Sequence, residues 1–302
     1  MVTIIGTVAF DSVKTPRGSF DRILGGSATY ASVAASLFNP VEIVSIVGRD
    51  FPEQHLQFFK SRHIGTQGVV ISGGQTFHWK GYYEGDMNQA FTQQTDLNVL
   101  LEFDPVIPAQ AKNSRIVFLA NLDPELQLKA LHQFRQPEVV ILDSMNFWID
   151  QKREALLAVL KEVDVLVLND QEIRQLTQKS NLIQAMHDVV DLGPKRVIVK
   201  KGEHGSMMYD GSVFSICPAL PLVEVVDPTG AGDSFAGAIA GYLAQAETIS
   251  DDTFRKAMLA GTLMSSFTVQ GFSLDRLKTV DRSLLNETYQ MLRNNVFFPD
   301  MI

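Results

Sequence analysis

A nine-residue segment, Asp227–Phe235, combines small residues and one carboxylate in a spacing that could do chemistry. It reads Asp-Pro-Thr-Gly-Ala-Gly-Asp-Ser-Phe, a turn followed by a predicted helix, with Asp233 at their junction. The first N–H groups of a helix lack intrahelical partners and carry partial positive charge, so an anion fits beside them. A carboxylate next to such a site can take the proton of a hydroxyl group that attacks phosphorus. The segment therefore predicts a kinase for a small molecule.

The helix behind this turn should begin near Gly232 or Asp233, because the Pro and Gly residues of the turn exclude an earlier start. An Asp at a helix start is also a common N-cap, contributing about 0.5–2 kcal/mol, and the segment alone leaves that alternative open. Gly237 and Gly241 lie inside the predicted helix, where each costs about 1 kcal/mol relative to Ala. We interpret them as a small-residue face that packs closely against the sheet.

Two further polar positions follow predicted strands. Asp11 comes after the first strand, at the carboxyl edge where open α/β sheets bind ligands. A carboxylate there could accept hydrogen bonds from two neighbouring hydroxyls, as in sugar recognition, or it could cap a turn. Asn169 follows another predicted strand, and Glu172 lies three residues later at the start of a predicted helix. This spacing is also that of a helix capping box.

Composition excludes several classes of protein. The chain has 302 residues, a net charge of −8 and no run of Lys or Arg, which argues against nucleic acid or an anionic membrane as the main partner. Cys217 is the single cysteine, so a disulfide framework or thiolate metal cluster is excluded. No P-loop, dinucleotide fingerprint or serine-hydrolase elbow occurs in the sequence. The N-terminus resembles no secretory leader, and we expect a cytoplasmic protein.

Short apolar runs alternate with helical patterns, which predicts one doubly wound α/β domain over residues 1–302 with a mainly parallel sheet. The predicted strands are Val2–Ala9, Val41–Val47, Arg115–Ala120, Val139–Leu142, Val163–Leu168 and Arg196–Lys200. The predicted helices are Ala28–Phe38, Pro52–Ser61, Pro124–Phe134, Lys152–Glu162, Asp170–Thr177, Leu182–Val190, Ser234–Ala246, Asp251–Val269 and Arg282–Asn294.

Two stretches interrupt this alternation. Residues 10–24 are polar with Pro and Gly, and residues 68–98 show the alternating pattern of antiparallel strands. We expect them to form together a small, discontinuous β-lid. The alternative is a pair of surface hairpins that do not move. An exposed strand edge of such a lid could pair two subunits into a homodimer.

The segment Asp227–Phe235 resembles the signature of the ribokinase-like (PfkB) carbohydrate kinase family. Other motifs of that family appear in its order over roughly residues 1–280. They are Asp11, the pair Gly25-Gly26, the Asn-x-x-Glu motif at Asn169 and the Lys200–Gly205 turn. The resemblance implies a ribokinase-like fold with a β-lid. It also implies ATP-dependent phosphorylation of a hydroxymethyl group on a sugar or sugar-like molecule.

The resemblance also assigns roles around the acceptor. Asp233 would be the general base, and the N–H groups of the preceding turn would form an anion hole for the transferring phosphoryl group. Asp11 would bind the acceptor. The glycine pair would act as the hinge of the lid and line the same site. The anion-hole residues are Gly230, Ala231 and Gly232, and the hinge residues are Gly25 and Gly26.

On the nucleotide side, the resemblance implies that Asn169 faces the phosphates of ATP and that Glu172 binds Mg²⁺ through water. Gly202 and Gly205 would contact ATP through their backbone, with Lys200 either neutralising phosphate charge or pointing into solvent. Family members often bind a monovalent cation near the signature. Asp227 and the loop around Gly271 could supply ligands here, but that loop matches loosely and the cation is left open.

The chain departs from the family pattern at two positions. Tyr30 stands where many sugar-specific members have Asn, and Lys200 stands where Thr is common. A ring at position 30 could stack on a sugar or a base, or fill the pocket, so the acceptor is either a sugar or a nucleoside. A catalytically idle sugar- or nucleotide-binding regulator on the same fold is a further alternative, which the retained Asp233 argues against.

Overall fold

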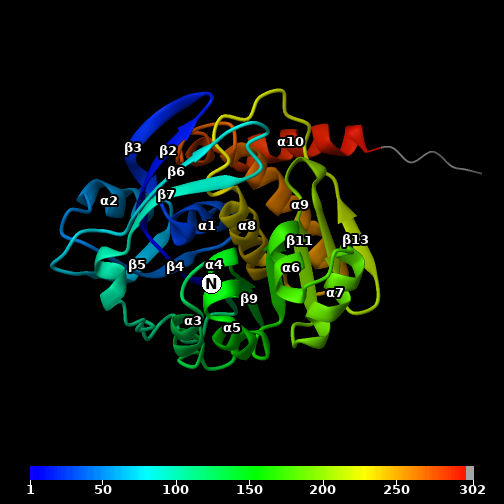
Figure 1. Cartoon of the computed structure of the whole chain (residues 1–302), viewed down its shortest axis with the longest axis horizontal. Coiled ribbons are helices and arrows are strands. Elements are labelled where there is room, and N and C mark those ends of the chain that lie inside the picture. The colour runs from blue at the N-terminus through cyan, green and yellow to red at the C-terminus, as the bar shows by residue number, and fades with distance from the viewer. Residues whose placement is uncertain (297–302) are drawn as a thin grey trace, which may run out of the picture.

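A nine-stranded sheet runs through the computed structural model, which describes residues 1–296 (Figure 1). The strand order is β13-β12-β11-β10-β9-β8-β1-β4-β5, and all strands from β11 to β5 are parallel. The bounds are β1 Val2–Ile5, β4 Val41–Val47, β5 Ile64–Ile71, β8 Ile116–Leu119, β9 Val139–Asp143, β10 Val165–Asn169, β11 Arg196–Lys200, β12 Ser206–Tyr209 and β13 Phe214–Cys217. The predicted mainly parallel sheet is confirmed.

The central strands are mainly apolar because both of their faces are covered. Every residue of β1, β4, β8 and β9 is buried. The strands that we did not predict, β5, β12 and β13, lie at the two ends of the sheet, where polar or exposed residues interrupt the apolar run. The predicted strand Val2–Ala9 is too long, since β1 ends at Ile5 and a strand of the second sheet begins at Ala9.

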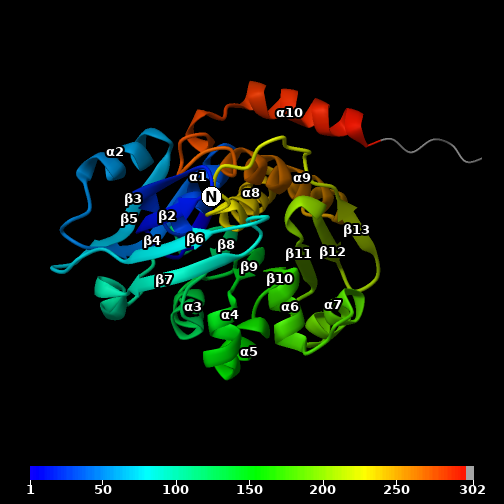
Figure 2. The same ribbon diagram turned by 45° about the horizontal axis from the view of Figure 1, so that its top comes forward.

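Helices cover both faces of the sheet (Figure 2). The first apolar core lies against α1 (Ser27–Ser36), α2 (Glu53–Ser61), α8 (Ala231–Gln245) and α9 (Asp251–Thr268), with α10 (Arg282–Asn295) packed outside α9. The second core lies against α3 (Pro124–Leu131), α4 (Asn146–Gln151), α5 (Arg153–Leu160), α6 (Asp170–Thr177) and α7 (Leu182–Asp191). The predicted helices are present, and α4 is additional. Within residues 1–296, no helix is both long enough and apolar enough to cross a membrane.

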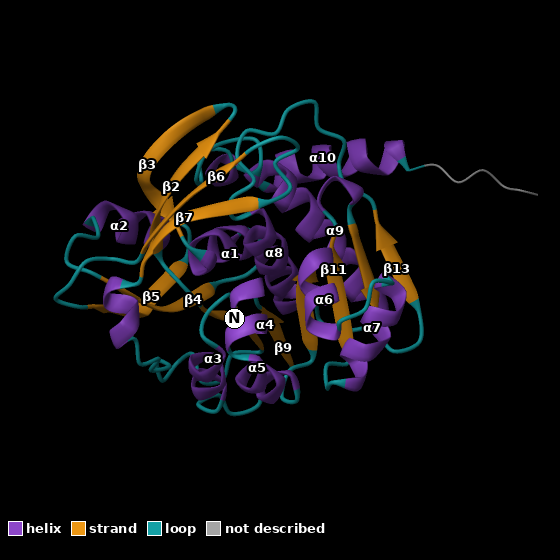
Figure 3. Cartoon of the chain, in the orientation of Figure 1, coloured by secondary structure: helices purple, strands orange, loops and turns teal. Residues whose placement is uncertain are grey.

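Four strands form the small sheet, which lies beside the large one (Figure 3). Its order is β3-β2-β6-β7, with bounds β2 Ala9–Thr15, β3 Gly18–Gly25, β6 His78–Tyr83 and β7 Ala90–Asp96. The expected start of its second segment at residue 68 is wrong, because residues 68–71 end β5 of the large sheet. The antiparallel pairing predicted within the second segment is confirmed for β6 and β7, whereas β2 of the first segment runs parallel to β6.

The small sheet contacts the segment that leads into α8. Thr15 Oγ1 donates to the carbonyl of Val226 at 2.9 Å, and Thr229 Oγ1 donates to the Tyr83 hydroxyl at 3.2 Å. On its other side, Arg22 forms an ion pair with Asp50 at 2.7 Å. The small sheet therefore covers the start of α8, where the predicted general base lies.

Gly237 and Gly241 pack against α1, and the expectation that they pack against the sheet is wrong. A Cβ atom on Gly237 would lie 2.2 Å from the carbonyl oxygen of Ala31, and one on Gly241 would lie 2.6 Å from that of Ala35. The missing side chains let α1 and α8 approach backbone to backbone. This contact sets the position of α8 and therefore of its first turn.

Replacing Gly237 with Ala should lower the free energy of unfolding by about 1–3 kcal/mol, because the added methyl group overpacks this contact. Helix propensity alone would stabilise the variant by about 1 kcal/mol, so the sign of the change separates the two effects. Denaturant unfolding measures it. Gly73→Ala is the control, since its Cβ would meet its nearest atom at 3.8 Å. A more stable Gly237→Ala variant would contradict the packing argument.

Candidate active site

The turn before α8 exposes backbone donors. Gly230 caps the helix with a φ of 76°, and the first helical residue is Ala231, one position before the predicted start. The N–H of Ala231 donates to the carbonyl of Pro228 at 3.1 Å. Within residues 1–296, the N–H groups of Gly230 and Gly232 have no backbone acceptor. These two donors lie at the positive end of a 15-residue helix, as an anion site requires.

Asp233 lies in the first turn of α8, half-buried. Burial raises the pKa of its carboxyl group to about 7, and the nearby carboxylate of Asp143 adds to this increase. The ammonium group of Lys200 opposes it. A carboxyl group with a pKa near neutrality is suited to accept a proton and release it again.

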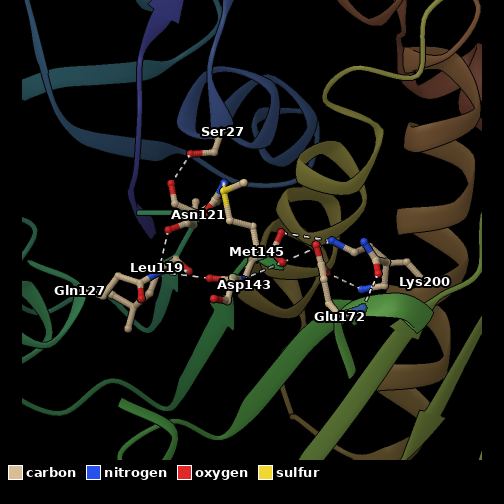
Figure 4. A network of polar contacts seen from close by, with 11 residues as sticks. Ser27, Leu119, Asn121, Gln127, Asp143, Met145, Glu172 and Lys200 are labelled. Carbon is tan, nitrogen blue, oxygen red and sulfur yellow. Dashed lines mark hydrogen bonds and ion pairs between the residues drawn. The ribbon is translucent and has the colours of Figure 1, made fainter. Parts of the chain in front are cut away.

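Asp143, Glu172 and Lys200 meet at the carboxyl ends of neighbouring strands (Figure 4). Lys200 ends β11, and its Nζ lies 3.2 Å and 3.3 Å from the two carboxyl oxygens of Asp143, which ends β9. Burial raises the pKa of Asp143, and Lys200 opposes the shift. Sequence reasoning missed Asp143. The available signal was a charged residue directly after the buried run Val139–Leu142.

Asn169 and Glu172 form a capping box on α6, so the capping alternative is confirmed. Asn169 Oδ1 accepts from the N–H of Glu172 at 2.8 Å, and Glu172 Oε2 accepts from the N–H of Asn169 at 2.8 Å. Burial raises the pKa of Glu172 to about 7, while Lys200 opposes this and Asp143 adds to it. The cap therefore holds the Glu172 carboxyl group beside the Asp143–Lys200 pair.

Asp11 lies within β2 of the small sheet, 4% exposed, rather than in a loop after β1. Its carboxyl group covers Gly25 so closely that a Cβ there would lie 1.9 Å from Oδ2. Gly26 has a φ of 95°, and its Cβ would lie 2.5 Å from the carbonyl oxygen of Thr7. The geometry therefore requires both glycines.

The electrostatic environment of Asp11 links it to α8. Burial raises the pKa of Asp11 to about 8, with further contributions from Asp227 and Asp233. The N–H of Gly26 hydrogen-bonds to the carboxyl group and opposes the shift. The carboxyl group of Asp233 is thus close enough to raise the pKa of Asp11.

Tyr30 is buried in α1, and its ring packs against the signature turn. A Cβ on Gly230 would lie 2.3 Å from Tyr30 Cγ. The Tyr30 hydroxyl is buried and has no hydrogen-bond partner within residues 1–296. Burial raises its pKa well above the usual value, and Asp11 adds to this. The ring therefore fills space beneath the turn, which is one of the alternatives predicted for it.

The Lys200–Gly205 turn is built on left-handed glycines. Gly202 and Gly205 have φ values of 54° and 81°, and the N–H of Lys201 donates to the carbonyl of Gly205 at 2.8 Å. The loop between β6 and β7 reaches this turn, because a Cβ on Gly202 would lie 2.9 Å from Oδ1 of Asn88. Lys200 points toward Asp143 rather than into solvent.

These features define a class of protein: a doubly wound α/β fold with backbone donors at the N-terminus of a helix, beside a carboxyl group whose pKa is raised to about 7. Residues 1–277 match the pfkB family of carbohydrate kinases, and the chain belongs to that family. It is therefore an ATP-dependent phosphotransferase for a sugar or a nucleoside, and kinases of this family use ATP with Mg²⁺.

Relatives of known name agree with this assignment. The chain is 30% identical to cytidine kinase of Thermococcus kodakarensis, over 80% of this chain and 88% of that one. It is 27% identical to ribokinase of Lactococcus lactis, over 89% and 92%. Among solved structures, an Escherichia coli protein described as a ribokinase II, in complex with ATP and Mg²⁺, superposes with a TM-score of 0.79. That match has 19% identity and covers 97% of this chain and 99% of the other, which shows the shared fold.

Proposed function

We propose that this protein transfers the γ-phosphoryl group of ATP to a hydroxymethyl group of a sugar or sugar-like acceptor, with Asp233 as the general base. One observation carries the proposal. The Asp233 carboxyl group lies at the start of α8, beside the N–H groups of Gly230 and Gly232 and close to both Asp11 and Lys200.

In the proposed reaction, Asp233 takes the proton of the attacking hydroxyl group. The N–H groups of Gly230 and Gly232 stabilise negative charge on the transferring phosphoryl group. Ala231, the third predicted donor, already bonds the carbonyl of Pro228, so it supports the turn and contributes less to the anion hole than its neighbours. On the nucleotide side, the backbone of Gly202 and Gly205 contacts ATP, and Asn169 faces its phosphates.

Asp11 would accept hydrogen bonds from two hydroxyl groups of the acceptor, with Gly25 and Gly26 forming the floor of that site. The small sheet is the proposed lid. Its contacts with Val226 and Thr229 bring it over the start of α8, where closure excludes water that would otherwise hydrolyse ATP. Tyr83 of β6 was not predicted and joins the lid to the signature through Thr229.

The residues present fit Mg²⁺ bound mainly by phosphates and water. Glu172 is held by its cap next to Asp143, and both carboxyl groups have raised pKa values that a divalent cation would lower. Within residues 1–296, no three acidic, His or Cys side chains form a metal site of their own, and Mg²⁺ commonly takes only one or two protein carboxylates. When bound, Mg²⁺ neutralises charge on the ATP phosphates.

A monovalent cation site beside the signature is also proposed. Asp227 is 1% exposed, and its Oδ2 has no hydrogen-bond partner within residues 1–296. Burial raises its pKa, while backbone N–H groups of Thr229 and Ser273 oppose the shift. Potassium should therefore stimulate the wild-type rate but not that of Asp227→Asn. Equal wild-type rates in potassium and in choline salts would contradict this site.

The acceptor is proposed to be a sugar, with a nucleoside as the second candidate. The 30% identity to a cytidine kinase favours the nucleoside. The buried position of the Tyr30 ring argues against a base stacking on it. A screen of ATP consumption across sugars, polyols and nucleosides tests both candidates. Failure of every acceptor to stimulate ATP consumption would contradict the proposed function.

The activity should rise with pH through about 7, because the proposed base must be ionised to accept a proton and the pKa of Asp233 is raised to about 7. Below that pH, kcat/KM should fall about tenfold per pH unit, and above it the profile should level off. Initial rates at limiting acceptor, measured across neutral pH, test this. A flat profile would contradict the assignment of Asp233 as the base.

A homodimer through the lid stays a prediction. Strand β7 is an edge of the small sheet, and six of its seven residues are exposed. Its unpaired backbone groups could pair with a second copy. Light scattering after gel filtration would detect such a dimer.

A further inference from the structure

Lys200 places an ammonium group among the carboxylates of the proposed active site. Its side chain is 18% exposed, and it pairs with Asp143, which is 5% exposed at its side chain. Burial lowers the pKa of Lys200, but the carboxylates of Asp143, Glu172 and Asp233 outweigh this effect and hold the pKa above its usual value. Lys200 therefore carries its positive charge inside the site.

The same ammonium group lies next to the proposed anion hole. A Cβ on Gly232 would lie 2.9 Å from Lys200 Nζ, so Nζ occupies the space beside Gly232 that a side chain would fill. The N–H of Gly232 has no backbone acceptor within residues 1–296. An anion that accepts a hydrogen bond from this N–H would thus meet Lys200 as well. The ion pair, the glycine and the free N–H converge on one small volume.

We infer that Lys200 contacts the transferring phosphoryl group directly, and that Asp143 is the positioning residue that holds the ammonium group toward the anion hole. This inference rests on the proposed kinase reaction. It gives Lys200 a role in the transfer step itself, in addition to binding ATP. A shorter, uncharged side chain such as Thr could not supply this contact.

In the phosphoryl transfer, one bond forms, one bond breaks and one proton moves. The acceptor oxygen forms a bond to the γ-phosphorus, and the bond between that phosphorus and the β–γ bridging oxygen breaks. The electron pair of the broken bond leaves with ADP, and the acceptor proton moves to Asp233. Negative charge lies on the phosphoryl oxygens throughout, and a fixed ammonium group beside them lowers the barrier.

Asp143 explains why Lys200 is held in place. Lysine is a flexible point charge with three donors, so an unrestrained ammonium group could pair with Asp233 and occupy the base. The contact of Lys200 with both oxygens of Asp143, at 3.2 Å and 3.3 Å, keeps it toward β9. One of its three donors then remains available for a phosphoryl oxygen.

The test compares Lys200→Met and Lys200→Arg with wild type. Lys200→Met should lower kcat by on the order of 10²-fold, the usual loss for one donor to a reacting oxyanion. Lys200→Arg keeps the charge and should recover part of that loss. Lys195→Met is the matched control, because Lys195 precedes the other end of the same strand, is 74% exposed and pairs with Asp164. It should retain the wild-type kcat.

The pH profile separates this role from a merely structural one. Asp233 is surrounded by Asp143, Asp11, Glu172 and Lys200, of which only Lys200 favours its ionised form. In Lys200→Met, the pH below which kcat/KM falls (the acidic limb of the profile) should therefore be higher than in wild type. In Lys200→Arg, this pH should stay near the wild-type value. Unchanged kcat and an unchanged limb in Lys200→Met would overturn the inference.

If Lys200→Met does not fold, because Asp143 is left buried without its partner, the neutral pair Asp143→Asn/Lys200→Met replaces it. Its kcat should be on the order of 10²-fold below that of wild type. A wild-type kcat in this double variant would overturn the inference. The proposed function fails differently: wild-type protein would then consume no ATP with any acceptor.

Discussion

Replacing Asp233 with Asn should lower kcat by about 10²–10⁴-fold and leave the fold intact, the usual range for the loss of a general base. Asn has nearly the same shape and keeps a carbonyl oxygen, but it cannot accept the acceptor proton. The structure places this side chain at the start of α8, where burial has already raised its pKa to about 7. Steady-state rates at saturating ATP and acceptor measure the effect, with thermal unfolding as the check on the fold.

A matched control separates catalysis from helix capping. Asp252 also lies in the first turn of a helix, α9, but it is exposed and pairs with Lys256. Asp252→Asn removes the same charge from the same kind of position and should leave kcat unchanged. Near-normal activity of Asp233→Asn would refute the assignment of the base. An equal loss in both variants would show that the helix terminus, rather than the carboxylate, is responsible.

The second large effect is expected at Asp11. Asp11→Ala should weaken acceptor binding by about twofold to tenfold for each hydrogen bond lost, since a hydrogen bond between uncharged groups contributes about 0.5–1.5 kcal/mol. Binding of ATP should be nearly unchanged, because Asp11 lies on β2 of the small sheet, whereas the Lys200–Gly205 turn proposed to contact ATP lies at the end of β11. Calorimetric titrations with each ligand separate the two affinities. Loss of ATP binding with intact acceptor binding would overturn the role of Asp11.

The stability of a second variant, Asp11→Asn, gives an independent check on the burial of Asp11. The folded-state pKa of Asp11 is raised to about 8 from 3.8, so its ionised form is disfavoured in the folded protein. Such a group lowers stability progressively as the pH rises from the unfolded-state to the folded-state value. At neutral pH, Asp11→Asn should therefore unfold at the same or a higher temperature than wild type. Asp21→Asn, an exposed change on the same sheet, is the control.

The elements that the sequence predicted well are those with a local signal. Strands covered on both faces, such as β8 and β9, are nearly continuous apolar runs, and α8 follows a turn that excludes helix. The missed strands β5, β12 and β13 lie toward the edges of the sheet, where one face or one side is open and polar residues interrupt the run. Edge strands owe their conformation to pairing with a neighbour distant in the sequence, which a local pattern does not contain.

The residues of the candidate site also fall into two groups, those that a local sequence pattern predicts and those whose role depends on distant parts of the chain. Asp233, the glycine turns and the Asn169–Glu172 cap could be read locally, because each depends on residues within a few positions of one another. For Asp143 the only local signal was its place after a buried run, and its role depends on Lys200, 57 positions away in the chain. The role of Tyr30 was equally hidden, because its ring packs on Gly230 through the contact between α1 and α8.

By itself, the sequence determined the class of fold, the helix that presents the proposed base and the family to which the chain belongs. Tertiary structure alone decided which charges share the site, that α8 packs on α1, and that the small sheet covers the signature. The physical reason is the distance along the chain over which each kind of interaction acts. Backbone propensity, capping and turn chemistry act over a few residues, whereas ion pairs and close packing depend on which strands and helices become neighbours.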